Sequence, residues 1–436
     1  MIKQAIILAG GKGTRLKNIL NGKPKPLVEI NNKPLLKYQI DLLIKYKIKS
    51  IIILANYKIE QIEDFVNHEY SNQNIKVLDD GISPLGTGGC LIKYNKIFEK
   101  KYIVLYGDTY LDIDLSKMIE FHLQKKSDLT LFTHPNSHPF DSDIVIESEN
   151  KVLEIKPYPH KKDFFYKNLV NAALYILNKN IFADKFIINK NITDFAKDLI
   201  PQIINNNKKV FSYNSKEYIK DCGTENRILS VINDLKNNIP FKSRKISLKK
   251  IIFIDRDGTL IKSVDQLNKI EQVEIFDNSF EAIKILNKKG FVVALVTNQP
   301  VIARGELSIE GLKNIHDFIE WELGKNGAYL DQIKFCPHHP HKGFDGEIVE
   351  LKINCECRKP KTQLIQEVIK EFNGDLKNSW IIGDTTVDIK TGKNSGLRSI
   401  LVKTGFAGKD RKYNVEPDFI FNDILESVNY IINDNN

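Results

Sequence analysis

The chain has 436 residues, of which 42% are hydrophobic and 27% are charged, and its formal net charge is +9. This length predicts two domains of about 200 residues each, and the composition is that of a globular protein. No run approaches the roughly 18 apolar residues that cross a bilayer, and the N-terminus lacks the pattern of a signal peptide. Because the lysines are mixed with acidic residues, nucleic-acid binding is disfavoured. We therefore expect a cytoplasmic protein that binds neither nucleic acid nor membranes.

Short apolar runs alternate with amphipathic segments along the chain. The expected strands are residues 5–9, 50–55, 75–78, 102–106, 129–133, 170–177, 251–254, 292–296, 381–382 and 399–402. One helix is expected to begin at Pro34 with Leu36, Ile40 and Leu43 on one face, and another to follow the N-cap Ser308. The alternation predicts an α/β fold with two domains, each a mainly parallel sheet flanked by helices.

The expected boundary between these domains is the polar, basic stretch from residue 237 to residue 250, giving domains 1–240 and 249–436. Ligands in such folds bind beyond the carboxyl ends of the strands. The motifs that follow the expected strands are therefore the candidates for chemistry.

A glycine-rich loop follows the first expected strand. Gly10, Gly11 and Gly13 allow a triphosphate to approach the backbone, whose N–H groups line an anion site together with Thr14. Arg15 adds a planar fork of donors that suits phosphate oxygens. The spacing is neither that of a dinucleotide-binding loop nor that of a P-loop, so alone it is also consistent with a tight strand-to-helix turn.

Further motifs follow in the first half: a lysine between two prolines, a second glycine loop, and aspartates at two strand ends. Their central residues are Lys25, Gly86, Thr87, Asp108 and Asp221. Two carboxylates together with substrate phosphates are a common way to hold Mg²⁺. Each aspartate taken singly is equally consistent with a helix cap or a turn.

In this order the motifs resemble the sugar-phosphate nucleotidyltransferase family over about the first 235 residues, and within it the heptose-1-phosphate guanylyltransferases. The resemblance implies transfer of a nucleotidyl group, with GTP as the preferred donor, to a sugar 1-phosphate. It implies that Asp108 and Asp221 bind Mg²⁺, while Arg15 and Lys25 steady the triphosphate and the transition state. Residues 79–84 lack the glutamate that relatives often carry, so no residue identifies the base.

The same resemblance implies that Lys156 and Asn171 contact the sugar phosphate. Two simpler interpretations stay open. Lys156 is also consistent with a solvated lysine at a strand end, and Asn171 with an amide that bonds to the local backbone.

In the second half, Asp255 and Asp257 follow an apolar strand and are separated by one residue. One can act as a nucleophile while the other serves as general acid and then base. The pattern resembles the haloacid dehalogenase (HAD) superfamily, whose phosphatases form an aspartyl-phosphate. The resemblance implies that Asp255 is the nucleophile and Asp257 the acid/base, with Mg²⁺ held by Asp255, the Asp257 carbonyl and Asp384. Asp388 either orients this site or caps the following helix.

The remaining motifs of the superfamily occur in the expected order. Thr297 and Asn298 end the next strand, and both are expected to bind phosphate. The resemblance implies that Thr297 binds the transferring phosphoryl group and that Lys359 neutralises the charge of this group. Arg304 and Arg358 are candidates for holding a distal phosphate of the substrate.

A cluster of cysteine and histidine lies between these motifs. Its expected ligands are Cys336, His338, Cys355 and Cys357. Three thiolates and one imidazole suit structural Zn²⁺, and the Cys-x-His spacing favours His338 over His339 and His341. Such a loop resembles the heptose-1,7-bisphosphate and histidinol-phosphate phosphatases, over about residues 249–430.

Both halves resemble enzymes that act on the same sugar. We expect the second domain to remove the 7-phosphate of D-glycero-D-manno-heptose 1,7-bisphosphate, and the first to convert the heptose 1-phosphate into a nucleotide sugar for surface polysaccharide. The expected cofactors are Mg²⁺ in both domains and Zn²⁺ in the second. The expected partners are a nucleoside triphosphate and a phosphorylated heptose, with a homo-oligomer left open. Two alternatives remain: a pairing of the same two chemistries on other substrates, and a non-catalytic binding role for one domain.

Overall fold

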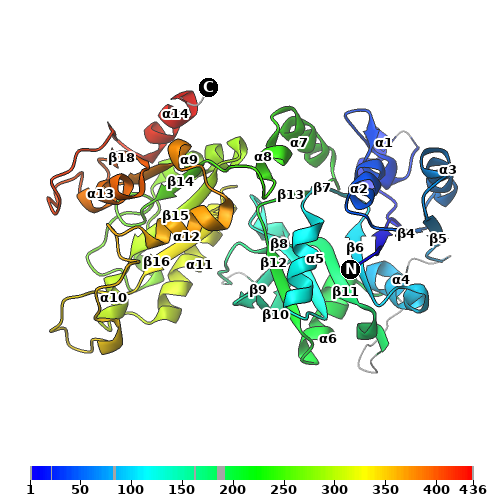
Figure 1. Cartoon of the computed structure of the whole chain (residues 1–436), viewed down its shortest axis with the longest axis horizontal. Helices are drawn as coiled ribbons and strands as arrows, with labels where there is room; N and C mark the ends of the chain where they lie inside the picture. Colours follow the sequence, from blue (N-terminus) through cyan, green and yellow to red (C-terminus); the bar gives the residue numbers. More distant parts are fainter. Residues whose placement is uncertain (1, 21, 82–84, 162–163, 184–191, 435–436) are drawn as a thin grey trace. The chain divides into compact units, whose positions relative to one another are not determined.

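The computed structural model describes residues 2–20, 22–81, 85–161, 164–183 and 192–434 (Figure 1). The chain divides into two compact units. Unit 1 comprises Met1–His134, Ser142–His160 and Leu169–Arg244. Unit 2 comprises Pro135–Asp141, Lys161–Asn168 and Lys245–Asn436.

Unit 1 is built on a nine-stranded sheet with the order β5-β4-β1-β6-β11-β8-β12-β10-β9. These strands are β1 (Gln4–Leu8), β4 (Ser50–Ala55), β5 (Ile75–Asp79), β6 (Lys101–Tyr106), β8 (Leu129–His134), β9 (Ile144–Ser148), β10 (Lys151–Lys156), β11 (Val170–Asn178) and β12 (Val210–Asn214). The four strands from β5 to β6 are parallel, as expected. Beyond β6 the sheet is mixed, because β11 runs antiparallel to both β6 and β8.

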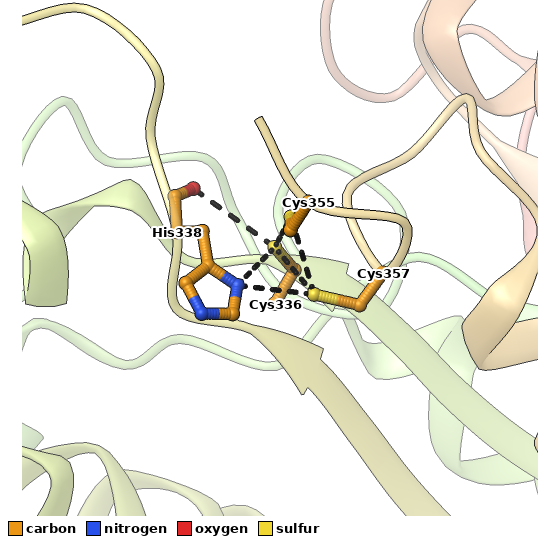
Figure 2. Close-up of side chains that lie close together, drawn as sticks. All are labelled: Cys336, His338, Cys355 and Cys357. Atoms are coloured by element: carbon orange, nitrogen blue, oxygen red, sulfur yellow. Dashed lines mark hydrogen bonds between the residues drawn. The ribbon is translucent and has the colours of Figure 1, made fainter. Parts of the chain in front are cut away.

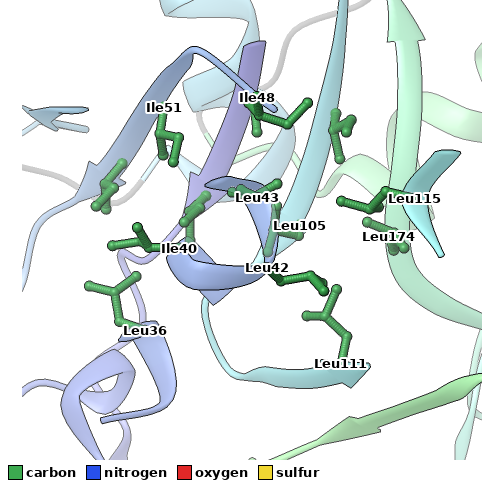
Figure 3. Packing of buried hydrophobic residues seen from close by; sticks show 14 of the residues in the cluster. Leu36, Ile40, Leu42, Leu43, Ile48, Ile51, Leu105, Leu111, Leu115 and Leu174 are labelled. Atoms are coloured by element: carbon green, nitrogen blue, oxygen red, sulfur yellow. The ribbon is translucent and has the colours of Figure 1, made fainter. Parts of the chain in front are cut away.

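Two short antiparallel pairs complete the strands of unit 1: β2 (Glu29–Ile30) with β3 (Lys33–Pro34), and β7 (Thr109–Asp112) with β13 (Tyr218–Asp221). The helices are α1 (Lys17–Leu20), α2 (Leu35–Lys45), α3 (Ile59–Tyr70), α4 (Gly86–Tyr94), α5 (Leu115–Gln124), α6 (Ile200–Asn205), α7 (Glu225–Lys236) and α8 (Ile239–Ser243). The expected helix after Pro34 is α2. Its residues Leu36, Ile40 and Leu43 are buried against one face of the sheet (Figure 3).

Unit 2 contains a six-stranded sheet, parallel throughout, in the order β16-β15-β14-β17-β18-β19. The strands are β14 (Ile251–Ile254), β15 (Val292–Asn298), β16 (Gln332–Cys336), β17 (Trp380–Gly383), β18 (Arg398–Val402) and β19 (Phe419–Phe421). The helices are α9 (Asp277–Lys289), α10 (Pro300–Ala303), α11 (Ile309–Lys325), α12 (Gln363–Phe372), α13 (Thr386–Ser395) and α14 (Ile424–Asp434). Ser308 caps α11 as expected, because its hydroxyl accepts the backbone N–H of Gly311.

Alternating side chains of the central strand β14 enter two separate cores. Ile252 and Ile254 pack with α9, α11 and α14 on one face of the sheet. Ile251 and Phe253 pack with α12 on the other. Burial on both faces accounts for the continuous apolar run of this strand, and it leaves the carboxyl edge of the sheet as the place where polar side chains collect.

Every strand expected from the sequence is present, with its ends within two residues of the expected positions. Among the described residues, no helix combines the length and the apolar character that a membrane span requires.

Candidate active sites and a candidate metal centre

The glycine-rich loop of unit 1 lies next to the end of β6. The N–H of Gly107 donates to the carbonyl of Leu8 at 2.8 Å, and a Cβ at Gly107 would lie 3.1 Å from that oxygen. Gly13 has φ +63°, a conformation that favours glycine, and a Cβ there would lie 3.1 Å from the Cβ of Lys25. The loop, Lys25 and the end of β6 are therefore packed at one edge of the sheet.

Asp108 and Asp221 lie at the same end of the β7–β13 ribbon. Asp221 pairs with Thr109 in this ribbon, and the N–H of Cys222 donates to the carbonyl of Asp108 at 2.7 Å. Lys25 forms an ion pair with Asp108, and its side chain is only 11% exposed. The structure thus brings together Lys25 and both predicted metal-binding carboxylates.

Asp221 has features that suit a cation. One carboxylate oxygen pairs with Arg227, while Oδ1 is buried and has no hydrogen-bond partner among the described residues. A carboxylate oxygen held without a donor is costly unless a ligand completes it. Together with Asp108, this donor set fits Mg²⁺.

The other residues of the loop lie close by. Thr14 and Arg15 are exposed in a short 3-10 turn that directly follows Gly13. Gly11 is open, whereas a Cβ at Gly10 would lie 2.4 Å from a carboxylate oxygen of Asp80. Asp80 is buried, and burial together with Asp79 raises the pKa of its carboxyl. The sequence alone does not indicate Asp80, because its approach to the loop depends on the pairing of β4 with β5.

The second glycine loop packs closely against residues 193–195 of unit 1. Gly86 has φ +78°, and a Cβ there would lie 2.4 Å from the carbonyl oxygen of Thr193. The hydroxyl of Thr87 accepts the N–H of Phe195 at 2.8 Å and donates to Asp194 at 3.2 Å. This hydroxyl is thus bonded within the protein.

The two residues predicted to contact the sugar phosphate differ in their surroundings. Lys156 ends β10, is 40% exposed and pairs with Glu154. Asn171 lies where the register of β11 against β8 shifts, and it donates to the hydroxyl of Tyr175 at 2.8 Å. Its Oδ1 is buried without a partner among the described residues, which leaves an acceptor for a hydroxyl group.

Lys359 is the centre of the site in unit 2. Its ammonium group lies 2.6 Å from Asp255 and 2.6 Å from Asp388, and it donates to the carbonyl of Val296 at 2.9 Å. Burial alone would lower the pKa of Lys359, but Asp255 and Asp388 together hold it above its ordinary value. Conversely, burial raises the pKa of Asp255, Asp388 adds to this effect, and Lys359 opposes it.

Three buried carboxylates converge beside this lysine. Asp255, Asp384 and Asp388 each offer an oxygen, and these atoms lie within 4.8 Å of one another. Oδ1 of Asp384 is buried and has no partner among the described residues. Gly258 and Gly405 make room for this carboxylate, since a Cβ at either would lie within 2.4 Å of its Oδ2. A dense set of oxygen ligands with an unsatisfied acceptor fits Mg²⁺.

The two interpretations of Asp388 are compatible. Its Oδ2 accepts the N–H and the hydroxyl of Thr385, which forms the capping box of α13. Its Oδ1 accepts Lys359. One carboxylate therefore both caps the helix and orients the lysine.

The remaining predicted phosphate ligands have different partners. Thr297 is buried at the end of β15, and its hydroxyl accepts the amide of Gln299 at 2.8 Å. Asn298 exchanges two hydrogen bonds with the backbone of Lys359, at 2.9 and 3.1 Å. Asn298 thus positions Lys359 through its backbone.

Arg304 and Arg358 lie within electrostatic reach of each other, and Arg358 contacts the cysteine-histidine loop. Arg358 donates to the carbonyl of His338 at 3.1 Å, and burial together with Arg304 lowers the pKa of Arg358. Arg304 lies 4.8 Å from the ring centre of Phe344, and its Nε is buried without a partner among the described residues. Two neighbouring guanidinium groups of this kind suit an anion.

Figure 2 shows the cluster of Cys336, His338, Cys355 and Cys357. The sulfur atoms lie 3.2 to 3.5 Å apart, too far for a disulfide, and all three cysteines are free. Nδ1 of His338 lies 3.2 Å from the Cys357 sulfur and 3.7 Å from that of Cys336. Neither His339 nor His341 belongs to this group within the described part of the chain. The four atoms form a compact set that fits a tetrahedral metal ion.

In magnesium-free buffer, we expect Asp384→Asn to stabilise unit 2 at about pH 8. Burial, with a smaller contribution from Asp388, raises the pKa of Asp384 from 3.8 to about 6. The stability contributed by this carboxyl is therefore complete below pH 3.8 and is lost as the pH rises through about 6. Above that pH, ionisation of Asp384 lowers the free energy of unfolding of wild-type unit 2 by about 3 kcal/mol. The variant has no carboxyl group at this position and keeps this stability.

Denaturant titrations followed by tryptophan fluorescence check this result, because the only two tryptophans, Trp321 and Trp380, belong to unit 2. The difference between variant and wild type should shrink as the pH falls from about 8 to about 4. A difference that stayed constant over this range would contradict the assignment.

Each of the two α/β units gathers carboxylates and a lysine at the carboxyl ends of its strands, an arrangement typical of enzymes that act on phosphate groups. The nucleotidyl transferase family model matches residues 4–238, which is more than half of the chain, and a HAD-hydrolase-like family model matches residues 356–427.

Curated relatives match each unit. A D-glycero-beta-D-manno-heptose-1,7-bisphosphate 7-phosphatase of Pasteurella multocida is 39% identical over 159 residues, 36% of this chain and 84% of the relative. A D-glycero-alpha-D-manno-heptose 1-phosphate guanylyltransferase of Aneurinibacillus thermoaerophilus is 34% identical over 221 residues, 50% of this chain and 93% of the relative. The crystal structure of a D,D-heptose 1.7-bisphosphate phosphatase from B. bronchiseptica, complexed with magnesium and phosphate, is 26% identical with a TM-score of 0.38, covering 42% of this chain and 99% of that one.

The chain belongs to the nucleotidyl transferase family in its first half and to the HAD-like phosphatases in its second. It is a bifunctional enzyme, with a nucleotidyltransferase and a phosphatase in one polypeptide.

Proposed function

We propose that this enzyme makes a nucleotide-activated heptose in two steps. Unit 2 removes the 7-phosphate of D-glycero-D-manno-heptose 1,7-bisphosphate. Unit 1 then transfers GMP from GTP to the heptose 1-phosphate and releases pyrophosphate. The observation that carries the proposal is that each half is independently similar to an enzyme named for the same sugar. The proposal assigns the transferase to residues 1–240 and the phosphatase to residues 249–436.

In the phosphatase step, Asp255 attacks the 7-phosphorus and forms an aspartyl-phosphate. Lys359, 2.6 Å from Asp255, neutralises the charge of the phosphoryl group. Asp257 protonates the departing sugar oxygen and then takes a proton from the water that hydrolyses the intermediate. Arg304 and Arg358 hold the 1-phosphate, which keeps the reactive 7-phosphate at the nucleophile.

In the transferase step, an oxygen of the heptose 1-phosphate attacks the α-phosphorus of GTP. The backbone of the loop at Gly11 and the exposed Arg15 bind the triphosphate, and Lys25 neutralises charge as pyrophosphate leaves. Asn171 contributes its buried acceptor to the sugar. These roles require positioning and charge neutralisation, with no covalent chemistry by the protein.

We propose Mg²⁺ as the cofactor of both units. Asp108 and Asp221 would hold it in unit 1, and Asp255, Asp384 and the Asp257 carbonyl in unit 2. When bound, the ion supplies positive charge that offsets the phosphate oxygens.

One reaction tests the two steps together. Intact enzyme is incubated with heptose 1,7-bisphosphate, Mg²⁺ and all four nucleoside triphosphates, and mass spectrometry identifies the products. Both anomers are supplied separately, because the phosphatase relative is named for the β-anomer and the guanylyltransferase relative for the α-anomer. We expect GDP-heptose from the α-anomer. Accumulation of heptose 1-phosphate from both would refute the proposed acceptor or donor, and an unchanged bisphosphate would refute the proposed phosphatase substrate.

We also propose that the cysteine-histidine cluster binds structural Zn²⁺. We expect the purified chain to carry one zinc ion and Cys357→Ser to lose it, because three ligands no longer close the tetrahedron. The tryptophan fluorescence transition of unit 2 should shift to lower denaturant in the same variant. Cys90→Ser serves as the control, since Cys90 is a buried cysteine of unit 1 outside the cluster. Equal zinc content in all three proteins, by mass spectrometry of the metal, would exclude this cluster as the zinc site.

A further inference from the structure

Arg256 is a fully buried arginine that lies in the sequence between Asp255 and Asp257 of the phosphatase site. It is 1% exposed and is among the largest fully buried side chains of the chain. Its Nε and Nη2 donate to both oxygens of Asp257 at 3.0 to 3.2 Å. A guanidinium group that is buried away from water needs hydrogen-bond acceptors for its N–H groups. A carboxylate that accepts two parallel hydrogen bonds from it has little freedom to rotate.

Gln299 connects this pair to the phosphate-binding side of the site. Its Oε1 accepts Nη2 of Arg256 at 2.8 Å. Its Nε2 donates to Asp257 at 3.0 Å and to the hydroxyl of Thr297 at 2.8 Å. Because the carbonyl end faces the arginine, the amide end is directed at these two acceptors, and Gln299 is only 2% exposed.

His316, from helix α11, completes the surroundings of the arginine. Its Nε2 lies 3.4 Å from Nη1 of Arg256. Burial, and then Arg256 itself, lowers the pKa of His316 well below its ordinary value. The neutral ring is therefore an acceptor for the guanidinium. Asp257, Gln299 and His316 surround one buried cation.

We propose that Arg256 and Gln299 are positioning residues for the phosphatase reaction. Arg256 holds Asp257 in the orientation from which it protonates the leaving group. Gln299 supports the same carboxylate and directs the hydroxyl of Thr297. Since that oxygen already accepts from Gln299, its own proton is available for the phosphoryl group. The inference rests on the proposed phosphatase function, in which Asp257 is the general acid.

The choice of leaving group separates this role from a purely structural one. General acid catalysis contributes about 10²- to 10⁴-fold when the leaving group is a poor one such as a sugar alkoxide. A 4-nitrophenolate leaves with little need for a proton. Displacing Asp257 therefore slows formation of the aspartyl-phosphate from a sugar phosphate far more than from 4-nitrophenyl phosphate, and kcat/KM measures this first step, whereas hydrolysis of the aspartyl-phosphate is common to both substrates. A damaged fold lowers kcat/KM for both substrates.

The test compares full-length wild type with Arg256→Lys and Gln299→Met on heptose 1,7-bisphosphate and on 4-nitrophenyl phosphate. We expect kcat/KM for the heptose substrate to fall by about 100-fold in Arg256→Lys, with a much smaller loss of kcat/KM for the aryl ester. Gln299→Met should lower the ratio of kcat/KM for the heptose substrate to kcat/KM for the aryl ester, as Arg256→Lys does. This variant keeps the buried arginine and its partner Asp257. Arg398→Lys, at an arginine that pairs with Asp434, should leave the ratio unchanged.

Equal losses of kcat/KM for both substrates, or no loss for either, in folded variants would overturn the positioning role while leaving the phosphatase in place. Tryptophan fluorescence shows whether each variant is folded. A wild-type enzyme inactive on both esters would instead refute the phosphatase assignment, and the inference with it.

Discussion

Asp255→Asn abolishes release of phosphate from heptose 1,7-bisphosphate, with an expected loss on the order of 10⁴-fold or more. The amide cannot attack phosphorus, so the aspartyl-phosphate does not form. The fold should persist, because the side chain keeps its shape and its oxygen still accepts Lys359. Removing one of three crowded carboxylates also relieves the repulsion that Asp384 and Asp388 exert on Asp255.

The same variant should still make nucleotide-heptose when heptose 1-phosphate and GTP are supplied directly. Phosphate release and nucleotide-sugar formation are measured in parallel on the intact chain. Asp265→Asn, at an exposed aspartate of unit 2, is the matched control and should retain both activities. Wild-type phosphatase activity in Asp255→Asn would show that the nucleophile is a different residue.

Asp108→Asn eliminates nucleotide transfer while phosphate release continues, with an expected loss on the order of 10³-fold in the transferase rate. The substitution removes the charge opposite Lys25 and a carboxylate proposed to hold Mg²⁺. The carbonyl of Asp108 still accepts the N–H of Cys222, so the β7–β13 ribbon should stay intact. Free heptose 1-phosphate should therefore accumulate from the bisphosphate.

Chromatography of the sugar phosphates and of pyrophosphate measures this outcome. Raising the Mg²⁺ concentration should recover part of the rate if the missing carboxylate weakens metal binding. Asp64→Asn, at an exposed position of α3, provides the control with the same change in charge. Unchanged pyrophosphate release in Asp108→Asn would refute the role given to this residue.

Much of the fold could be predicted because its strands are unusually regular in sequence. Strands β14 and, after its first residue Gln4, β1 are buried on both faces, and their sequences are uninterrupted apolar runs. The strands β2, β3, β9, β10, β12, β16 and β19 were not predicted, and neither were β7 and β13. The strands β7 and β13 have four residues each, and their pairing depends on contacts between segments that lie about a hundred positions apart.

The sequence predicted the positions of some candidate site residues better than the contacts of others, because side-chain contacts depend on packing. Asp255, Lys359 and Asp384 carry the motifs of the superfamily, and Asp255 and Asp384 directly follow parallel strands, so their convergence could be expected. Asn298 is different: it was expected to bind phosphate, and the structure shows it bonded to the backbone of Lys359. Whether a side chain contacts a ligand or another segment is set by packing, which sequence spacing does not specify.

The chemistry of this protein can be read from its residue types, their order and their positions at strand ends, which are those of two phosphoryl-transfer sites and a cluster of three cysteines and one histidine. How those groups are coupled depends on the packed chain. The buried network of Arg256, Gln299 and His316 joins a loop, a strand end and a helix that are distant in the chain. A buried cation is stable only where hydrogen-bond acceptors lie within hydrogen-bond distance of it. Which acceptors lie that close depends on how the folded chain packs, and the sequence order does not specify this.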